Sequence, residues 1–231
     1  MTSDRKDEAA AASRGRLLAR PSAATGEPQP EGLHPIGSGG RRDGLLRVPP
    51  ARADGQPLPL IVMLHGAGGE ALGTLALIAA AAPDVLILLP ESRGSTWDII
   101  RGAFGPDVAF LDAALRGVFQ RHAVDHRRIA LAGFSDGASY ALTLAIGNGD
   151  LFTHALAFSP GFAVPPAAVG RPAIYISHGI ADAVLPINAC SRRLVPRFRA
   201  AGYAVQYHEF PDGHIVPPEI AAEAVALLAA G

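Results

Sequence analysis

The feature that most constrains the fold of this chain is the segment 128–138, in which an apolar, strand-like run leads directly into Gly133-Phe-Ser135-Asp-Gly137. In a Gly-x-Ser-x-Gly motif the strand turns into a helix within a few residues, and the strained turn exposes the serine hydroxyl above the sheet. Glycine is needed where the two backbones pass closely. The same motif also fits a serine that only caps a helix. The context in the rest of the chain decides between these interpretations.

Apolar runs alternate with helical stretches along the chain. Near-continuous apolar runs are typical of strands buried on both faces of a parallel sheet, and Ala- and Leu-rich or helically spaced apolar residues predict helices. The predicted strands are 58–64, 84–89, the run before Gly133, 154–158, 174–177 and 203–210, and the predicted helices are 70–82, 106–122, 136–146, 186–201 and 218–230. This alternation predicts an α/β fold with a mostly parallel sheet and helices on both faces. Residues 17–19 and 45–48 are expected edge strands.

The bulk properties favour one soluble domain. At 231 residues, 49% of them apolar, the chain can bury a sizeable core. Residues 1–40 mix alanine, charge, proline and glycine and are expected to be largely mobile, so the folded domain is predicted to span 41–231. The net charge of −1 and the single Cys190 give no reason to expect nucleic-acid binding, a disulfide or a metal site. We expect a cytoplasmic monomer or homodimer without membrane insertion or a cofactor.

Chemically useful side chains follow the predicted strands. Ligands of parallel sheets bind beyond the carboxyl ends of the strands, and Ser135, Asp182 and His214 each lie just after one. A serine nucleophile needs a base and an acid that orients the base, and these three residues occur in the order serine, acid, histidine. They form the predicted catalytic triad. Asp212 is the alternative acid, and His178 is a rival base that better fits a structural hydrogen bond.

The predicted oxyanion hole and acyl pocket also lie on strand-end loops. Backbone N–H groups must stabilise the developing oxyanion. The expected donors are Asp136, directly after the serine, and Ala67, in the glycine-rich run 65–69. His65 is expected to hold that run in shape. Trp97, Phe162 and Val164 are apolar, loop-borne candidates for the acyl pocket. The segment between the strands ending at 158 and starting at 174 is too short for a separate lid domain, which predicts an open site.

The glycine-rich run permits another interpretation. Residues 66–71, Gly-Ala-Gly-Gly-Glu-Ala, match the dinucleotide-binding pattern G-x-G-x-x-G/A between a strand and a helix, with Asp84 and Glu91 near the position of a ribose-binding acid. A dinucleotide-binding protein is therefore the alternative function. It explains neither residues 133–137 nor the acid and histidine at later strand ends.

Several motifs together resemble one family. They are Leu-His-Gly-Ala-Gly at 64–68, Ser-Arg-Gly-Ser-Thr-Trp-Asp at 92–98, the motif at 133–137, His-Gly-Ile-Ala-Asp at 178–182 with Leu185-Pro186, and Gly213-His214 followed by Pro217-Pro-Glu219. From about residue 42 to the C-terminus the chain resembles the phospholipase/carboxylesterase family of α/β-hydrolases, which are small serine esterases without a lid. It is more loosely similar to polyhydroxybutyrate depolymerases and feruloyl esterases.

The resemblance implies an α/β-hydrolase fold and hydrolysis of carboxylic esters with short to medium acyl chains through an acyl-enzyme. It also implies Ser135 as nucleophile, Asp182 as acid, His214 as base, and the N–H groups of Ala67 and Asp136 as oxyanion donors. Two positions depart from the family. Many members have glutamine where this chain has Asp136 and a bulkier residue where it has Ala67, so the acyl pocket is expected to differ.

Overall fold

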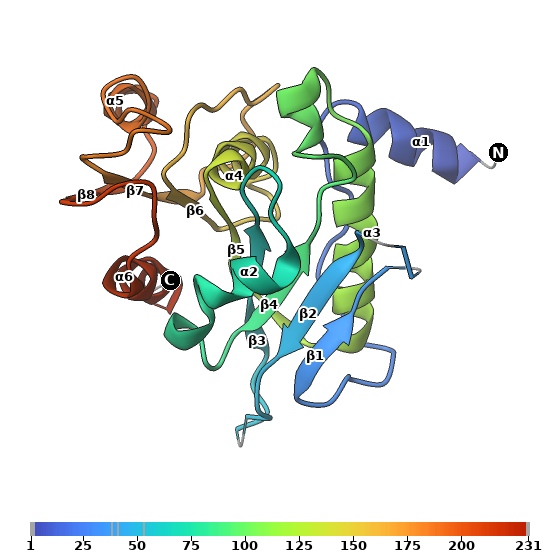
Figure 1. Cartoon of the computed structure of the whole chain (residues 1–231). Helices are drawn as coiled ribbons and strands as arrows, with labels where there is room; N and C mark the ends of the chain where they lie inside the picture. Colours follow the sequence, from blue (N-terminus) through green and yellow to red (C-terminus); the bar gives the residue numbers. More distant parts are fainter. Residues whose placement is uncertain (1–2, 38, 41, 53, 230–231) are drawn as a thin grey trace.

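The computed structural model describes residues 3–37, 39–40, 42–52 and 54–229, and its described part contains one eight-stranded sheet (Figure 1). The strands are β1 (Gly32–Pro35), β2 (Gly44–Val48), β3 (Leu58–Leu64), β4 (Leu86–Pro90), β5 (Val124–Phe134), β6 (His154–Phe158), β7 (Ala173–Gly179) and β8 (Val205–Phe210). Their order across the sheet is β1-β2-β4-β3-β5-β6-β7-β8. Strands β3 to β8 are parallel, and β2 is antiparallel to both of its neighbours, β1 and β4. The sheet is therefore mostly parallel, as predicted.

Helices cover both faces of the sheet (Figure 1). The helices are α1 (Ser3–Ala12), α2 (Ala71–Ala76), α3 (Pro106–Arg121), α4 (Asp136–Gly147), α5 (Ser191–Ala200) and α6 (Pro218–Ala229), with short 3₁₀ turns at Ala79–Ala81 and Asp98–Arg101. On β3, Leu60 and Val62 join a core with α3, α4 and α5, whereas Ile61 and Met63 join a second core with α2 and α6. Successive strand side chains point to opposite faces, so a strand with cores on both sides must be apolar throughout.

Several predicted boundaries are wrong. Residues 17–19 form no strand, and β1 was not predicted. The segment 45–48 belongs to β2, which is not an edge strand because it pairs with both β1 and β4. The helix expected at 70–82 is α2 followed by a 3₁₀ turn, and the one expected at 186–201 begins only at Ser191. Short propensity-rich segments are decided by tertiary contacts, which a local pattern does not contain.

The N-terminal segment packs against the rest of the chain. Leu17 is fully buried, and its N–H donates to Asn148 Oδ1 at 2.9 Å, while the amide of Asn148 donates to the Gly15 carbonyl at 2.8 Å. Arg16 forms an ion pair with Asp150 at 2.9 Å. Although composition predicts mobility for residues 1–40, part of this segment therefore contributes to the core. The division of the chain at residue 40 stays a prediction.

None of the helices in the described ranges combines the length and apolar composition needed to cross a membrane.

Candidate active site

The turn from β5 into α4 places Ser135 above the carboxyl edge of the sheet. Ser135 has φ 58° and ψ −120°, which is a strained conformation for a residue with a side chain. A Cβ on Gly133 would lie 2.3 Å from the Gly137 carbonyl carbon, and a Cβ on Gly137 would lie 2.4 Å from the Leu64 carbonyl oxygen. Only glycine fits at either position. The strained serine is thus held by close backbone packing on both sides.

The structure brings the three predicted triad residues together. His214 Nε2 lies 2.9 Å from Ser135 Oγ, and His214 Nδ1 lies 2.6 Å from Asp182 Oδ2. The three side chains come from the loops that follow β5, β7 and β8. Ser135 is 9% exposed, so most of the residue is screened from bulk water. This geometry lets Nε2 of the imidazole accept the serine proton while Nδ1–H keeps donating a hydrogen bond to the carboxylate, which stays ionised.

Asp182 is held by several donors. Its Oδ1 accepts the N–H groups of Val184 at 2.9 Å and Leu185 at 2.8 Å, while Oδ2 faces His214. Burial acts to raise the pKa of Asp182, but the hydrogen bonds from His214, Leu185 and Val184 outweigh burial, and the pKa lies below its ordinary value. The carboxylate is therefore ionised at neutral pH. That charge is what an imidazolium on His214 needs.

The two rival residues occupy other positions. Asp212 is exposed, and its carboxylate accepts the Gly213 N–H at 2.7 Å. His178 is fully buried, with Nδ1 2.6 Å from Ser191 Oγ and Nε2 2.7 Å from the Leu185 carbonyl. Both ring nitrogens of His178 are thus engaged away from Ser135, in keeping with the structural hydrogen bond expected for it.

His65 organises the glycine-rich loop that follows β3. Its Nε2 accepts the Ser92 N–H at 2.9 Å, so the proton is on Nδ1, which donates to the Gly66 carbonyl at 2.6 Å. Burial lowers the pKa of His65 and keeps the ring neutral. A second link comes from Gly68, whose N–H donates to the Ser95 carbonyl at 2.9 Å. Residues 65–69 are therefore held by the loop after β4.

The two expected oxyanion donors remain available. Within the described part of the chain, neither the Ala67 N–H nor the Asp136 N–H has a hydrogen-bond acceptor. Asp136 is the first residue of α4, where an N–H has no partner within the helix. Its side chain accepts the Thr96 hydroxyl at 2.6 Å. This bond ties the start of α4 to the loop that supports residues 65–69.

Trp97 does not lie where an acyl pocket would need it. The residue is only 1% exposed, its Nε1 donates to the His65 carbonyl at 2.9 Å, and its ring stacks on Tyr140 with centroids 5.1 Å apart. It therefore supports the glycine-rich loop from behind instead of lining an open pocket. An amphipathic tryptophan with a buried N–H needs an acceptor, and the backbone at His65 supplies it.

Phe162 and Val164 lie on a loop docked on α4. The N–H groups of Gly161 and Phe162 both face Ser139 Oγ, at 2.9 and 3.4 Å, and the Val164 N–H donates to Thr143 Oγ1 at 3.1 Å. Phe162 is half-buried and Val164 is 50% exposed. These apolar side chains are accessible, and their place in an acyl pocket stays a prediction.

Sequence reasoning missed a buried carboxylate pair beneath the loop after β4. Asp98 accepts the Tyr140 hydroxyl at 2.8 Å and the Gly105 N–H at 2.8 Å, and Asp107 accepts the Asp98 N–H at 2.6 Å. Burial, together with the charge of Asp98, raises the pKa of Asp107 against the pull of its backbone donors. No local pattern signals this pair, because its partners are contributed by separate segments.

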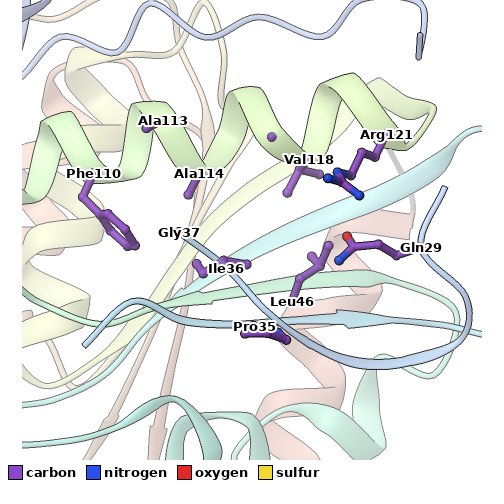
Figure 2. A pocket seen from close by; sticks show the side chains of 11 residues that line it. Gln29, Pro35, Ile36, Gly37, Leu46, Phe110, Ala113, Ala114, Val118 and Arg121 are labelled. Carbon is purple, nitrogen blue, oxygen red and sulfur yellow. The ribbon is translucent and has the colours of Figure 1, made fainter. Parts of the chain in front are cut away.

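The cavity in Figure 2 lies elsewhere. It encloses about 250 Å³ between α3 and the β1–β2 region, and its lining includes Ile36, Leu46 and Phe110 but no triad residue. Among the described residues there is also no group of three or more His, Cys, Asp or Glu side chains that could hold a metal ion.

Comparisons with solved structures show what kind of fold carries this geometry. The esterase PE8 superposes with a TM-score of 0.63 at 21% identity, over 82% of this chain and 98% of that one. The fluorophosphonate-binding serine hydrolase FphF of Staphylococcus aureus gives 0.65 at 13% identity, over 86% and 98%. The ferulic acid esterase of Anaeromyces mucronatus gives 0.62 at 16% identity, over 89% and 94%.

This chain has the α/β-hydrolase fold. No family model and no curated protein sequence matches it, so the assignment rests on the architecture. In an α/β-hydrolase the nucleophile turn follows a central strand, and here it follows β5, which pairs with β3 and β6. The neighbours do not favour the dinucleotide-binding alternative for residues 66–71.

Proposed function

We propose that this protein is a serine hydrolase that cleaves carboxylic esters through an acyl-enzyme. The observation that carries the proposal is the pair of short contacts at His214, 2.9 Å to Ser135 Oγ and 2.6 Å to Asp182 Oδ2. Nucleophile, base and acid in this arrangement recur on several unrelated folds that transfer acyl groups through a serine. The esterases among the structural neighbours support the same chemistry.

In the first half of the proposed reaction, Ser135 Oγ attacks the ester carbonyl carbon and its proton passes to His214 Nε2. The negative charge of Asp182 stabilises the imidazolium that forms. The N–H groups of Ala67 and Asp136 receive the oxyanion, each well-aimed donor contributing about 3 kcal/mol to the barrier reduction. His214 then protonates the leaving alcohol, and the acyl group stays on Ser135.

In the second half, His214 removes a proton from water, and the resulting hydroxide attacks the acyl-enzyme. The tetrahedral intermediate collapses with return of the proton to Ser135 Oγ, which releases the carboxylic acid. No metal or cofactor has a role in either half. His65 does not exchange protons in this scheme, because its two nitrogens hold Gly66 and Ser92.

We propose short to medium acyl chains as substrates. The loop between β6 and β7 is short and docks on α4 through Ser139 and Thr143, which leaves no separate lid domain over Ser135 in this part of the chain. The exposed Val164 and the half-buried Phe162 are the proposed apolar contacts for the acyl group. Lysophospholipids, acyl-thioesters and feruloyl esters are further candidates, the last because one neighbour was solved with ferulic acid bound.

The remaining expectations rest on composition and stay predictions. They are a cytoplasmic location, a monomer or homodimer, a small-molecule ester as substrate, and no nucleic-acid or membrane partner.

The test of the proposed function is Ser135→Ala on p-nitrophenyl esters from acetate to palmitate. The variant should lose at least about 10³-fold in kcat/KM because the nucleophile is gone, with little change in melting temperature. Ser13→Ala, at the exposed end of α1, is the matched control and should keep full activity. Substantial turnover by Ser135→Ala would refute the assignment.

A further inference from the structure

His178 is a buried titratable residue that the proposed mechanism does not use. It lies near the end of β7, is fully buried, and faces both the turn that carries Asp182 and the first residue of α5, Ser191. An apolar ring would fill the same space without needing hydrogen-bond partners. The polar contacts of His178 therefore indicate a role other than packing.

The hydrogen bonds fix where the proton on His178 lies. Nε2 faces two acceptors, the Leu185 carbonyl at 2.7 Å and Asp182 Oδ2 at 3.2 Å, so Nε2 carries the hydrogen. Nδ1 then accepts the hydroxyl of Ser191 at 2.6 Å. Burial lowers the pKa of His178, more than the Leu185 carbonyl and Asp182 raise it, and the ring stays neutral.

One oxygen of Asp182 thus lies beside two histidines. Oδ2 is 2.6 Å from His214 Nδ1 and 3.2 Å from His178 Nε2. The other oxygen, Oδ1, accepts the N–H groups of Val184 and Leu185, and the Leu185 carbonyl is the nearer acceptor of His178. His178 therefore contacts both the carboxylate and the turn that orients it.

We propose that His178 is a positioning residue for Asp182: its neutral imidazole, held by Ser191, fixes the 182–185 turn so that Oδ2 stays in hydrogen-bond contact with His214. The role rests on the proposed function, since it matters only if His214 is the base. One continuous series of polar contacts then links Ser191, His178, Asp182, His214 and Ser135. His178 cannot replace His214, because both of its nitrogens are engaged.

Other ionisable groups near His178 do not explain its contacts. Glu209 is its register partner on β8, but the Glu209 carboxylate accepts a hydrogen bond from Arg192 Nε at 2.8 Å. Cys190, next to Ser191, is buried, and burial raises the pKa of its thiol, so it stays uncharged. The charged groups that His178 faces are therefore Asp182 and, when protonated, His214.

The experiment compares His178→Gln with His178→Asn. The Gln amide can place an N–H near the position of Nε2, toward Leu185 and Asp182, whereas the shorter Asn amide reaches only the position of Nδ1, toward Ser191. We expect kcat for p-nitrophenyl acetate to fall about 10- to 100-fold in the Asn variant, the loss seen when a partner that orients a metal-binding histidine is removed. KM should be nearly unchanged, and Gln should restore most of kcat.

A second readout does not depend on turnover. The proton between His214 Nδ1 and Asp182 Oδ2 should give a far-downfield resonance in the ¹H NMR spectrum of the full chain. It should weaken or shift in His178→Asn and return in His178→Gln. If the wild type shows this resonance but hydrolyses no ester, the proposed function fails while the positioning role is still decided by the two variants.

Two results would overturn the proposal. One is a folded His178→Asn variant with wild-type kcat and an unchanged resonance. The other is an equal loss of kcat in the Asn and Gln variants that parallels a lower melting temperature, as expected of a histidine with only a structural role. Where His178→Asn does not fold, His178→Met takes its place, since it keeps the bulk but cannot donate a hydrogen bond.

Discussion

The carboxyl edge of the sheet and the cavity in Figure 2 differ in the polar side chains that they bring together. At the carboxyl edge, polar groups from the ends of β3, β7 and β8 gather, and His65, His178, Asp182 and His214 each have defined partners. The cavity between α3 and the β1–β2 region is hollow, but apart from Gln29 and Arg121 its lining is apolar or small. Chemistry depends on convergent polar groups, so a hollow alone does not mark a functional site.

Gly133 and Gly137 at the nucleophile turn differ in the same way from Gly117 on the α3 side of the cavity. Gly133 and Gly137 at the nucleophile turn have backbone atoms within 2.4 Å of where a Cβ would lie. Gly117, on α3 beside the cavity, has nothing within 4 Å. The backbone at the nucleophile turn thus leaves no room for a side chain, whereas the α3 side of the cavity has room at Gly117. The predictions below test this difference.

The largest expected effect is the difference in kcat between the Asp182→Asn and Asp212→Asn variants. Asp182→Asn should lower kcat by about 10³- to 10⁴-fold, because an amide cannot hold the Nδ1–H tautomer of His214 or stabilise its positive form. Asp212→Asn is the matched control and should stay close to wild type, since the Asp212 carboxylate is exposed and bonded only to the Gly213 N–H among the described residues. Steady-state kinetics on p-nitrophenyl acetate give the ranking. The reverse order would move the acid to Asp212.

The same substitution should have opposite effects on stability in the two regions. Gly137→Ala should lower the free energy of unfolding by about 3 kcal/mol or more, because its Cβ meets the Leu64 carbonyl at 2.4 Å and the backbone must shift. Gly117→Ala, in open space on α3, should raise it by up to about 1 kcal/mol through helix propensity. Urea denaturation measures both. Equal changes at the two glycines would contradict the contrast.

The smallest expected effect on stability concerns the ion pair between Arg192 and Glu209, which lies at the surface on β8. Hydrogen bonds from Arg192 lower the pKa of Glu209 to about 2, against the effect of burial. Because the pKa of Glu209 is lower in the folded protein than in the unfolded chain, the ionised carboxylate stabilises the fold at pH values above the unfolded pKa. This contribution is lost as the pH falls toward 2. Because both side chains are partly solvated, Glu209→Gln should cost less than about 1 kcal/mol at pH 7.

The difference in unfolding free energy between Glu209→Gln and wild type should shrink as pH is lowered from 5 to 2. A cost that is constant over this range would show that the pair does not act through the charge of Glu209.

The sequence was sufficient for the parallel core of the fold because that core has a local signature. Strands such as β3 and β6 are buried on both faces, and this burial makes them apolar throughout. The N-terminal segment has no such signature. Leu17 is held by Asn148, 131 residues away, and a contact of that kind cannot be read from composition.

At the site, what could be predicted was the order of residues at strand ends. Parallel strands bring their carboxyl ends to one edge, so Ser135, Asp182 and His214 could be placed together from their spacing. The side-chain direction of Trp97 could not. It lies on the expected loop but points into the protein toward the His65 carbonyl and Tyr140. The role proposed for His178 likewise depends on distances to Leu185 and Ser191 that no motif contains.

The most direct test of the central claim is to locate the nucleophile chemically. The wild-type protein is treated with a fluorophosphonate, digested, and mapped by mass spectrometry. A serine activated by His214 and Asp182 should carry the adduct at Ser135 alone, and Asp182→Asn should slow its formation strongly. An adduct on another residue, or ester hydrolysis without any adduct at Ser135, would contradict the account.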